Sequence, residues 1–218
     1  MYKNEEILNY ADKEEVTLTT EDGEITLTKM ELGNLYLATG QIVANDPYIC
    51  FETTPFIITE KPGYYPVSIS ITHYKHTGSE DKRVALALLK LSDKKPVRWE
   101  MALTSENTAE ELEKLGKDEF FGYGVDSGTG GFMDKTVAEK LAAGAGANVY
   151  DKIAKEFNAS YVPTYSYLLC SAIGGEHKDF ACFSSGWGDG CYPSYFGFDE
   201  EGNPCALVTD FCILPYEG

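Results

Sequence analysis

The sequence predicts an α+β protein in which strands outnumber helices. Two groups of strand-like segments, in which apolar and polar residues alternate, flank a central stretch that carries helix signals. The chain has 218 residues, 43% of them hydrophobic, which is enough for one core without disulfides. We therefore expect a single globular domain over residues 1–218, with mostly antiparallel, sandwich-like sheets and about three short helices between the two strand groups.

The first half of the chain predicts strands joined by turns. Residues 16–20 and 25–28 alternate at period two around an acidic turn, which predicts a peripheral hairpin within residues 1–31. Further strands are expected at 35–43, 67–74, 84–91 and 97–103. The segment 84–91 is apolar on both faces, which favours a central strand. In the last strand Val97 should point inward, together with Trp99, Met101 and Leu103.

Three helices are predicted in the middle of the chain, each by a signal at its start. Thr108 and Glu111 match a capping box. Asp134 and Asn148 each precede apolar residues spaced along one helix face. Residues 144–147 (Gly-Ala-Gly-Ala) should form a hinge between the last two helices. The second strand group is expected at 164–173, 179–185, 192–198 and 205–214, with a hairpin turn at 199–203.

The charge of the chain limits the classes of partner. There are 18 Lys and Arg against 35 Asp and Glu, a net charge of −17. Such a surface repels nucleic acid and anionic membranes, so we expect neither as a partner, whereas it attracts basic proteins. The N-terminal residues do not resemble a signal peptide, and no segment is apolar enough to span a bilayer. A cytoplasmic location is expected.

The six cysteines show no metal-site spacing. None forms C-x-x-C, and we expect reduced, buried thiols. Four cysteines lie between residues 182 and 212, so a disulfide there stays open as an alternative.

Two glycine-rich segments carry the candidate site. In the first, Asp126-Ser127-Gly-Thr129 matches the D-[ST]-G-[ST] string around the catalytic carboxylate of aspartic proteases, but that chemistry needs a second carboxylate and the chain holds one copy. In the second, three glycines within five residues place Trp187 and Asp189 in a strand-end loop. Each segment also has a purely structural interpretation. In that interpretation the first is only a turn between a strand and a helix, and Trp187 of the second covers the core.

Single residues outside these segments give weaker signals. Asp210 lies in an apolar strand and must be hydrogen-bonded or have a raised pKa, and we favour a structural role for it. His73 and His76 should point to opposite strand faces and cannot chelate together. Neither a metal site nor a cofactor is predicted, with a looser cation site at Asp126 and Asp134 as the alternative. The candidate surface site comprises Asp126, Ser127, Thr129, Trp187, Asp189, Tyr192, Tyr195 and Asp210.

Several strings, by their order and spacing, resemble a bacterial family of uncharacterised proteins, domain of unknown function 4241. The strings are GQIVANDP at 40–47, PGYYPV at 62–67, VRWEMA at 97–102, FGYGVDSGTGGFMD at 121–134 and SGWGDG at 185–190, followed by Tyr195 and Asp210-Phe211. The resemblance implies a shared fold and no known activity, so no catalytic residue can be transferred. It also implies that Asp126 and Asp189 are neighbours on one surface.

These observations favour a non-catalytic, cytosolic binding module that recognises a basic protein, for example an immunity protein that binds a cationic toxin. Whether the protein is an enzyme stays open. The alternative is a carboxylate- or metal-dependent hydrolase that uses Asp126 and Asp189, with Asp210 or Asp134 as further members. That alternative requires the carboxyl oxygens to meet in one cleft.

Overall fold

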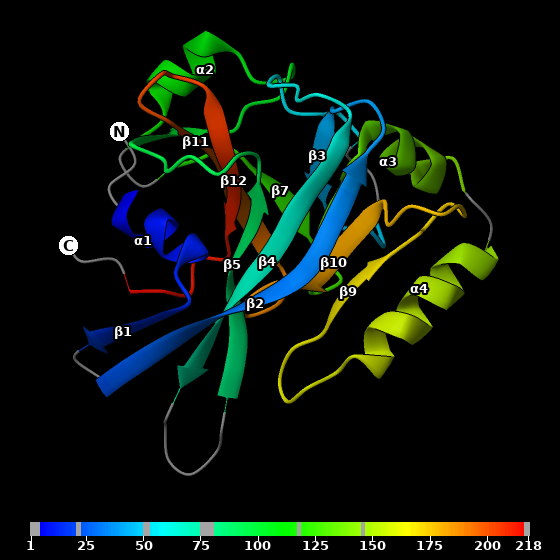
Figure 1. Cartoon of the computed structure of the whole chain (residues 1–218), viewed down its shortest axis with the longest axis horizontal. Helices are drawn as coiled ribbons and strands as arrows, with labels where there is room; N and C mark the ends of the chain where they lie inside the picture. Colours follow the sequence, from blue (N-terminus) through cyan, green and yellow to red (C-terminus); the bar gives the residue numbers. More distant parts are fainter. Residues whose placement is uncertain are drawn as a thin grey trace.

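The computed structural model describes residues 5–20, 23–49, 53–74, 81–116, 119–144 and 147–215, and its strands form two antiparallel sheets (Figure 1). The larger sheet has the order β1 (Glu15–Thr20), β2 (Gly23–Leu37), β4 (Gly63–Tyr74), β5 (Asp81–Lys90), β12 (Pro204–Asp210), β11 (Gly190–Phe198) and β6 (Arg98–Met101), with β7 (Gly122–Val125) paired to β11. The smaller sheet has the order β3 (Ile42–Asn45), β8 (Thr129–Asp134), β10 (Phe180–Ser184) and β9 (Tyr167–Cys170). The predicted strand-rich α+β class is confirmed.

The helices are short. They are α1 (Glu5–Asn9), the 3₁₀ helix η1 (Tyr10–Asp12), α2 (Ala109–Lys114), α3 (Lys135–Ala142) and α4 (Ala147–Ala159). In Figure 1, α1 lies at one side of the sheets, α3 and α4 lie at the other side, and α2 lies at the top. The capping box of Thr108 and Glu111 is present at α2, and Asp134 caps α3, as predicted. In the described part of the chain, no helix has the length and apolar character needed to cross a membrane.

Several predicted boundaries were wrong. The expected strand 35–43 is divided: its first residues end β2 and its last begin β3. Between them Gly40 has φ +77°, and a Cβ there would lie 1.8 Å from the carbonyl oxygen of Glu60, so the chain turns where only glycine fits. Val97 lies before β6 and is 56% exposed, because the strand begins only at Arg98.

Other differences concern the helices and the later strands. Helix α1 was not predicted, and α4 starts one residue before Asn148. The strand expected at 164–173 is limited to β9. The hinge predicted at 144–147 includes residues 145–146, and these and His76 lie outside the described residues.

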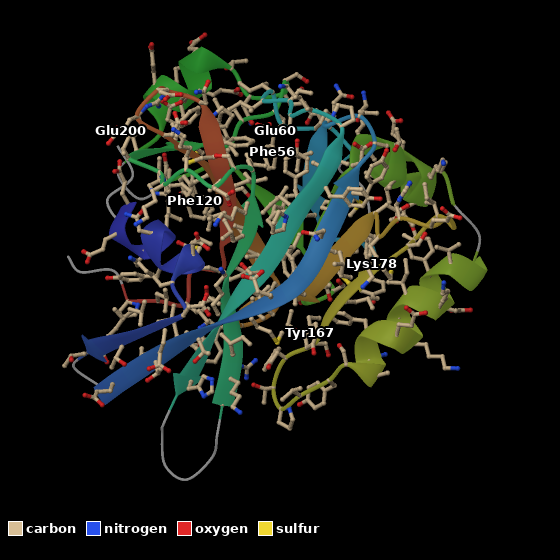
Figure 2. All side chains as sticks on the ribbon, viewed as in Figure 1. Phe56, Glu60, Phe120, Tyr167, Lys178 and Glu200 are labelled. Carbon is tan, nitrogen blue, oxygen red and sulfur yellow. The ribbon has the colours of Figure 1, made fainter. Side chains whose placement is uncertain are left out.

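The main hydrophobic cluster is made by residues of both sheets. It includes Leu35 of β2, Leu89 of β5 and Phe183 of β10. Phe56, labelled in Figure 2, lies in the segment after β3. Its ring packs edge-on against Phe196 of β11, with ring centroids 5.7 Å apart. This shared core fixes the position of each sheet against the other.

Two further clusters cover the outer faces. Leu8 of α1 packs with Leu88 of β5 and Val208 of β12, whereas Val137 of α3 packs with Phe180 of β10. Strand β5 therefore contributes side chains to clusters on both of its faces, which confirms the prediction of a central strand.

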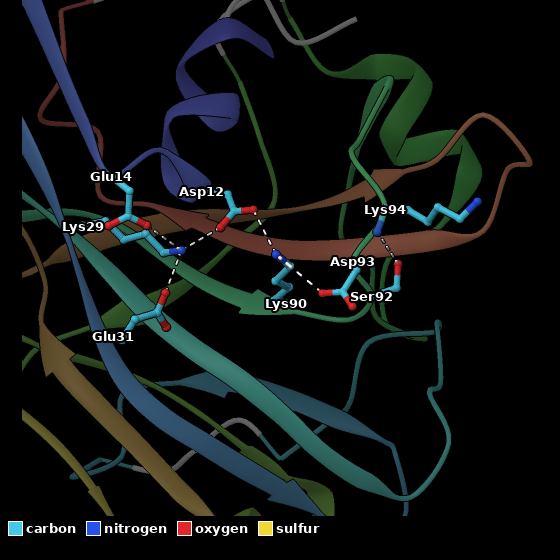
Figure 3. Close-up of polar contacts among 8 residues, drawn as sticks. All are labelled: Asp12, Glu14, Lys29, Glu31, Lys90, Ser92, Asp93 and Lys94. Carbon is cyan, nitrogen blue, oxygen red and sulfur yellow. Dashed lines mark hydrogen bonds and ion pairs between the residues drawn. The ribbon is translucent and has the colours of Figure 1, made fainter.

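An ion-pair network attaches η1 to the larger sheet (Figure 3). Asp12 lies 2.8 Å from Nζ of Lys29 and 3.3 Å from Nζ of Lys90, and Lys29 also pairs with Glu31 at 2.7 Å. Burial alone would raise the pKa of Asp12, but hydrogen bonds and charge from both lysines outweigh it and hold that pKa below its usual value. The folded state is therefore stabilised by the charged form of Asp12.

We expect Asp12→Asn to lower the free energy of unfolding at pH 7 by about 1 kcal/mol, because Asp12 is half-exposed and its pairs are partly screened. The folded pKa lies below the ordinary value of 3.8, so this stabilisation is complete above that pH and is lost as the pH falls below it. Urea unfolding across this range checks the prediction. Glu14→Gln is the control, since Glu14 is 88% exposed and 3.8 Å from Lys29; an equal loss in both variants would contradict the role of Asp12.

Candidate functional site

The two glycine-rich segments meet in space. Residues 126–128 (the first loop) connect β7 to β8, and residues 185–189 (the second loop) connect β10 to β11. Strand β7 pairs with β11 and strand β8 with β10, so both loops leave the same ends of paired strands. The amide of Ser185 donates to the carbonyl of Gly128 at 3.0 Å, and a Cβ on Gly128 would lie 3.8 Å from Cα of Gly188. The loops are therefore in direct contact.

The contact brings three predicted side chains to the protein surface. Val125 and Gly190 are partners in the β7–β11 pair, and Asp126 and Asp189 are the next residues beyond them on the two strands. Both aspartates are exposed, and Trp187 is 58% exposed. We call Asp126, Trp187 and Asp189 the loop surface.

The ring of Trp187 also contacts the larger sheet. The guanidinium carbon of Arg83, on β5, lies 4.9 Å from the centre of the indole ring, a cation–π distance. Arg83 in turn is held by Asp81 through Nε at 2.8 Å. One face of the indole is thus occupied by Arg83, although more than half of the side chain stays accessible.

Asp46, which sequence reasoning did not select, fixes the first loop from below. One of its carboxylate oxygens accepts from the amides of Asp126 (3.0 Å) and Ser127 (2.8 Å), and the other accepts from the hydroxyl of Ser127 (2.7 Å) and the amide of Tyr48 (2.9 Å). Its side chain is buried, with 3% of the residue exposed. A signal was present in the sequence: Asp46 is the sole charged residue between positions 40 and 51.

The second loop is fixed by its own glycines and by Tyr192. Gly186 has φ +54° and Gly188 φ +112°, the left-handed region that favours glycine. The hydroxyls of Ser185 and Tyr192 each donate to the carbonyl of Gly188 at 2.8 Å. Burial raises the pKa of Tyr192, and the nearby negative charge of Asp189 acts in the same direction. The loop is thereby ordered beneath Trp187.

The remaining predicted site residues are buried, except for Ser127. Thr129 is buried and its hydroxyl donates to the carbonyl of Ser127 at 3.4 Å, whereas Tyr195 packs in the cluster under α1. Asp210 is buried, and one of its oxygens accepts from the amide of Cys212 at 2.8 Å. Ser127 is exposed, but its hydroxyl donates a hydrogen bond to the carboxylate of Asp46. Ser127 and Thr129 therefore help to hold the first loop, whereas Tyr195 belongs to the core under α1.

Of the carboxylates proposed for a hydrolase, Asp126 and Asp189 lie on neighbouring loops, whereas Asp134 does not join them. Asp134 lies at the far end of β8 from the first loop, where one oxygen accepts from the amide and hydroxyl of Thr39 and the other from those of Thr136. Over the described residues, no cluster of three His, Cys, Asp or Glu side chains could hold a metal ion. One cavity, of about 130 Å³, lies near the opposite end of β7 and is lined by Gly122, Tyr123 and Tyr192.

Comparison with known proteins places the chain in a family. A family model described as "Protein of unknown function (DUF4241)" matches residues 35–209, a span that includes Asp46 and both loops. No curated protein and no solved structure matches the chain. Because the match covers well over half of the sequence, the chain belongs to the DUF4241 family.

Proposed function

We propose that this protein is a non-catalytic binding module that recognises a basic protein through the loop surface. The proposal rests on Trp187, which is 58% exposed and lies beside the exposed Asp126 and Asp189. The loops that carry these residues are held by hydrogen bonds with the residues under them. Tryptophan is among the residues that contribute most to protein–protein binding, and flanking carboxylates favour a Lys- or Arg-rich partner. An immunity-type role against a cationic toxin is one concrete form of this function.

The fixed conformation of the two loops favours binding. Asp46, Tyr192 and the Ser185–Gly128 hydrogen bond hold the loops in one conformation before a partner arrives. Less conformational entropy is then lost on binding, which raises affinity for a given contact area. The net charge of −17 increases the rate of encounter with a cationic protein, an effect that salt reduces.

The proposal also includes the packing of the sheets and the location of the protein in the cell. We infer a sandwich-like packing of the two sheets, supported by the cluster to which both contribute. We infer a cytoplasmic location, supported by the thiols of Cys170, Cys182 and Cys205, which are free and at least partly buried. The hydrolase alternative has less support, because Asp134 accepts from Thr39 and Thr136 at the far end of β8, and Asp210 is buried and accepts from the amide of Cys212.

The test is a quantitative pull-down from a lysate of the native host at low and high salt. Basic proteins should be enriched at low salt, and Trp187→Ala should reduce their capture by about tenfold or more. Tyr161→Ala is the matched control, since Tyr161 is similarly exposed on a different segment. Equal capture by both variants, or no basic protein at either salt concentration, would reject the proposal.

The charge contribution is tested separately. Asp126→Asn with Asp189→Asn should slow association with the captured partner by about threefold to tenfold at low salt, and the difference should shrink as salt is added. Glu113→Gln with Asp151→Asn removes the same charge from exposed positions elsewhere. Association rates measured by surface plasmon resonance decide the matter: identical rates for the two double variants would contradict a role for the loop carboxylates.

A further inference from the structure

A cavity of about 420 Å³ lies between the N-terminal helices and the larger sheet. Its apolar lining includes Leu8 of α1, Leu88 of β5 and Trp99 of β6. This volume falls within the range of small-molecule sites, which is about 300–1,000 Å³. The cavity is distinct from the loop surface, since none of its lining residues belongs to either loop.

The charge of the cavity lining is opposite to that of the protein. Lys13, Lys90, Lys94 and Lys95 line it, against Asp12 as the one acidic residue. In the whole chain acidic residues outnumber basic ones by 35 to 18. A lining with four lysines and one carboxylate is therefore a local positive region on an acidic molecule, and it attracts anions from a surface that otherwise repels them.

The four lysines differ in how far their charge is already neutralised. Lys90 lies 3.3 Å from Asp12 and 3.9 Å from Asp93 (Figure 3), and Lys94 lies 3.5 Å from Glu201. Among the residues that the structure describes, neither Lys13 nor Lys95 has a carboxylate within ion-pair distance. Both are exposed at the rim, so their ammonium groups are available to a ligand.

Trp99 supplies the wall of the cavity and also a means of observing it. The residue is buried, and its indole N–H donates to the side-chain oxygen of Asn9 at 3.1 Å, which fixes α1 beside the ring. A flat apolar group in the cavity would lie near this indole.

We propose that this cavity binds a small organic anion, with its apolar body against Leu8, Leu88 and Trp99 and its anionic group at Lys13 and Lys95. Apolar walls with a few convergent charges are the usual composition of a ligand site. The lysine ammonium is a point charge on a flexible chain and has three N–H donors, so it can bind a carboxylate, a sulfonate or a phosphate. The site is independent of the proposed binding of a basic protein.

The experiment uses 8-anilinonaphthalene-1-sulfonate and its neutral counterpart N-phenyl-1-naphthylamine, which share an apolar body and differ in the sulfonate. In a Trp187→Phe background Trp99 is the one remaining tryptophan of the two in the chain. We expect the sulfonate to quench Trp99 emission saturably and to bind about tenfold more tightly than the neutral compound. Equal affinity for both compounds, or unchanged Trp99 emission, would overturn the proposal.

The lysines are tested by Lys13→Gln with Lys95→Gln. Both side chains are exposed, so the double variant should fold normally, and affinity for the sulfonate should fall about threefold to tenfold while affinity for the neutral compound stays constant. Lys140→Gln with Lys155→Gln, on α3 and α4, is the matched control and should change neither affinity. Near-UV circular dichroism of each variant ensures that binding reports a folded protein. Equal weakening in the two double variants would mean that net charge, not this cavity, controls binding.

Discussion

Asp46→Ala is expected to lower the free energy of unfolding by about 3–5 kcal/mol, because it removes a buried carboxylate that accepts four partly buried hydrogen bonds. The amides of Asp126, Ser127 and Tyr48 and the hydroxyl of Ser127 all donate to this carboxylate. Hydrogen bonds to a charged group are worth more than neutral ones, and their loss is costly where water cannot replace the acceptor. Urea unfolding at pH 7 measures the change.

Asp126→Ala is the control for Asp46→Ala. It removes the same charge from the neighbouring loop, but its carboxylate is exposed, so the expected loss is below about 0.5 kcal/mol. Asp46→Asn should fall between the two, since the amide keeps one acceptor oxygen. Similar stability of the Asp46 and Asp126 alanine variants would show that the first loop does not depend on the buried carboxylate. If Asp46→Ala loses partner capture at a temperature where it is still folded, Asp46 is needed to keep the loop surface in its binding conformation.

The fold was predictable where the pattern was local. Alternation at period two located the first hairpin, whose strands pair from Glu15–Thr28 to Thr20–Gly23, and the two-faced apolar run located β5. The predicted strand 35–43 failed because its apolar residues continue through a turn that Gly40 makes, and only the nearby Glu60 backbone explains why glycine is required there. Helix α1 failed for a related reason: five residues give too short a pattern, and its stability comes from burying Ile7 and Leu8.

The site was predictable in part. The glycine spacing located the second loop, and Gly186 and Gly188 do adopt positive φ. The pairing of β7 with β11, which brings Asp126 next to Asp189, is a long-range contact that no local pattern encodes. Asp46 was missed because only the long-range pairing of β3 with β8 brings it to the first loop, 80 residues from Asp126, whose amide donates to it. Tyr192 and Tyr195 were grouped as surface aromatics, although β11 is buried along most of its length.

Gly186→Ala is expected to destabilise the protein by about 2–4 kcal/mol, from two causes that add. A φ of +54° costs an L-residue roughly 1–2 kcal/mol. The new Cβ would also lie 2.8 Å from Cγ2 of Ile213 and 3.0 Å from Cβ of Phe211, so one of these buried side chains must move. Because Gly186 precedes Trp187 directly, any relief of this overlap shifts the tryptophan and should weaken partner capture.

Gly202→Ala separates the two causes. Gly202 has φ +81° in the hairpin turn after Asp199, and a Cβ there meets nothing within 4 Å, so it carries the conformational cost without the overlap. We expect a loss of about 1 kcal/mol and unchanged capture. Chemical unfolding of both variants gives the steric contribution as their difference. If the two variants lose equal stability, the second loop is loosely packed against Phe211 and Ile213, and the fixed tryptophan on which the proposed binding function depends would have no structural basis.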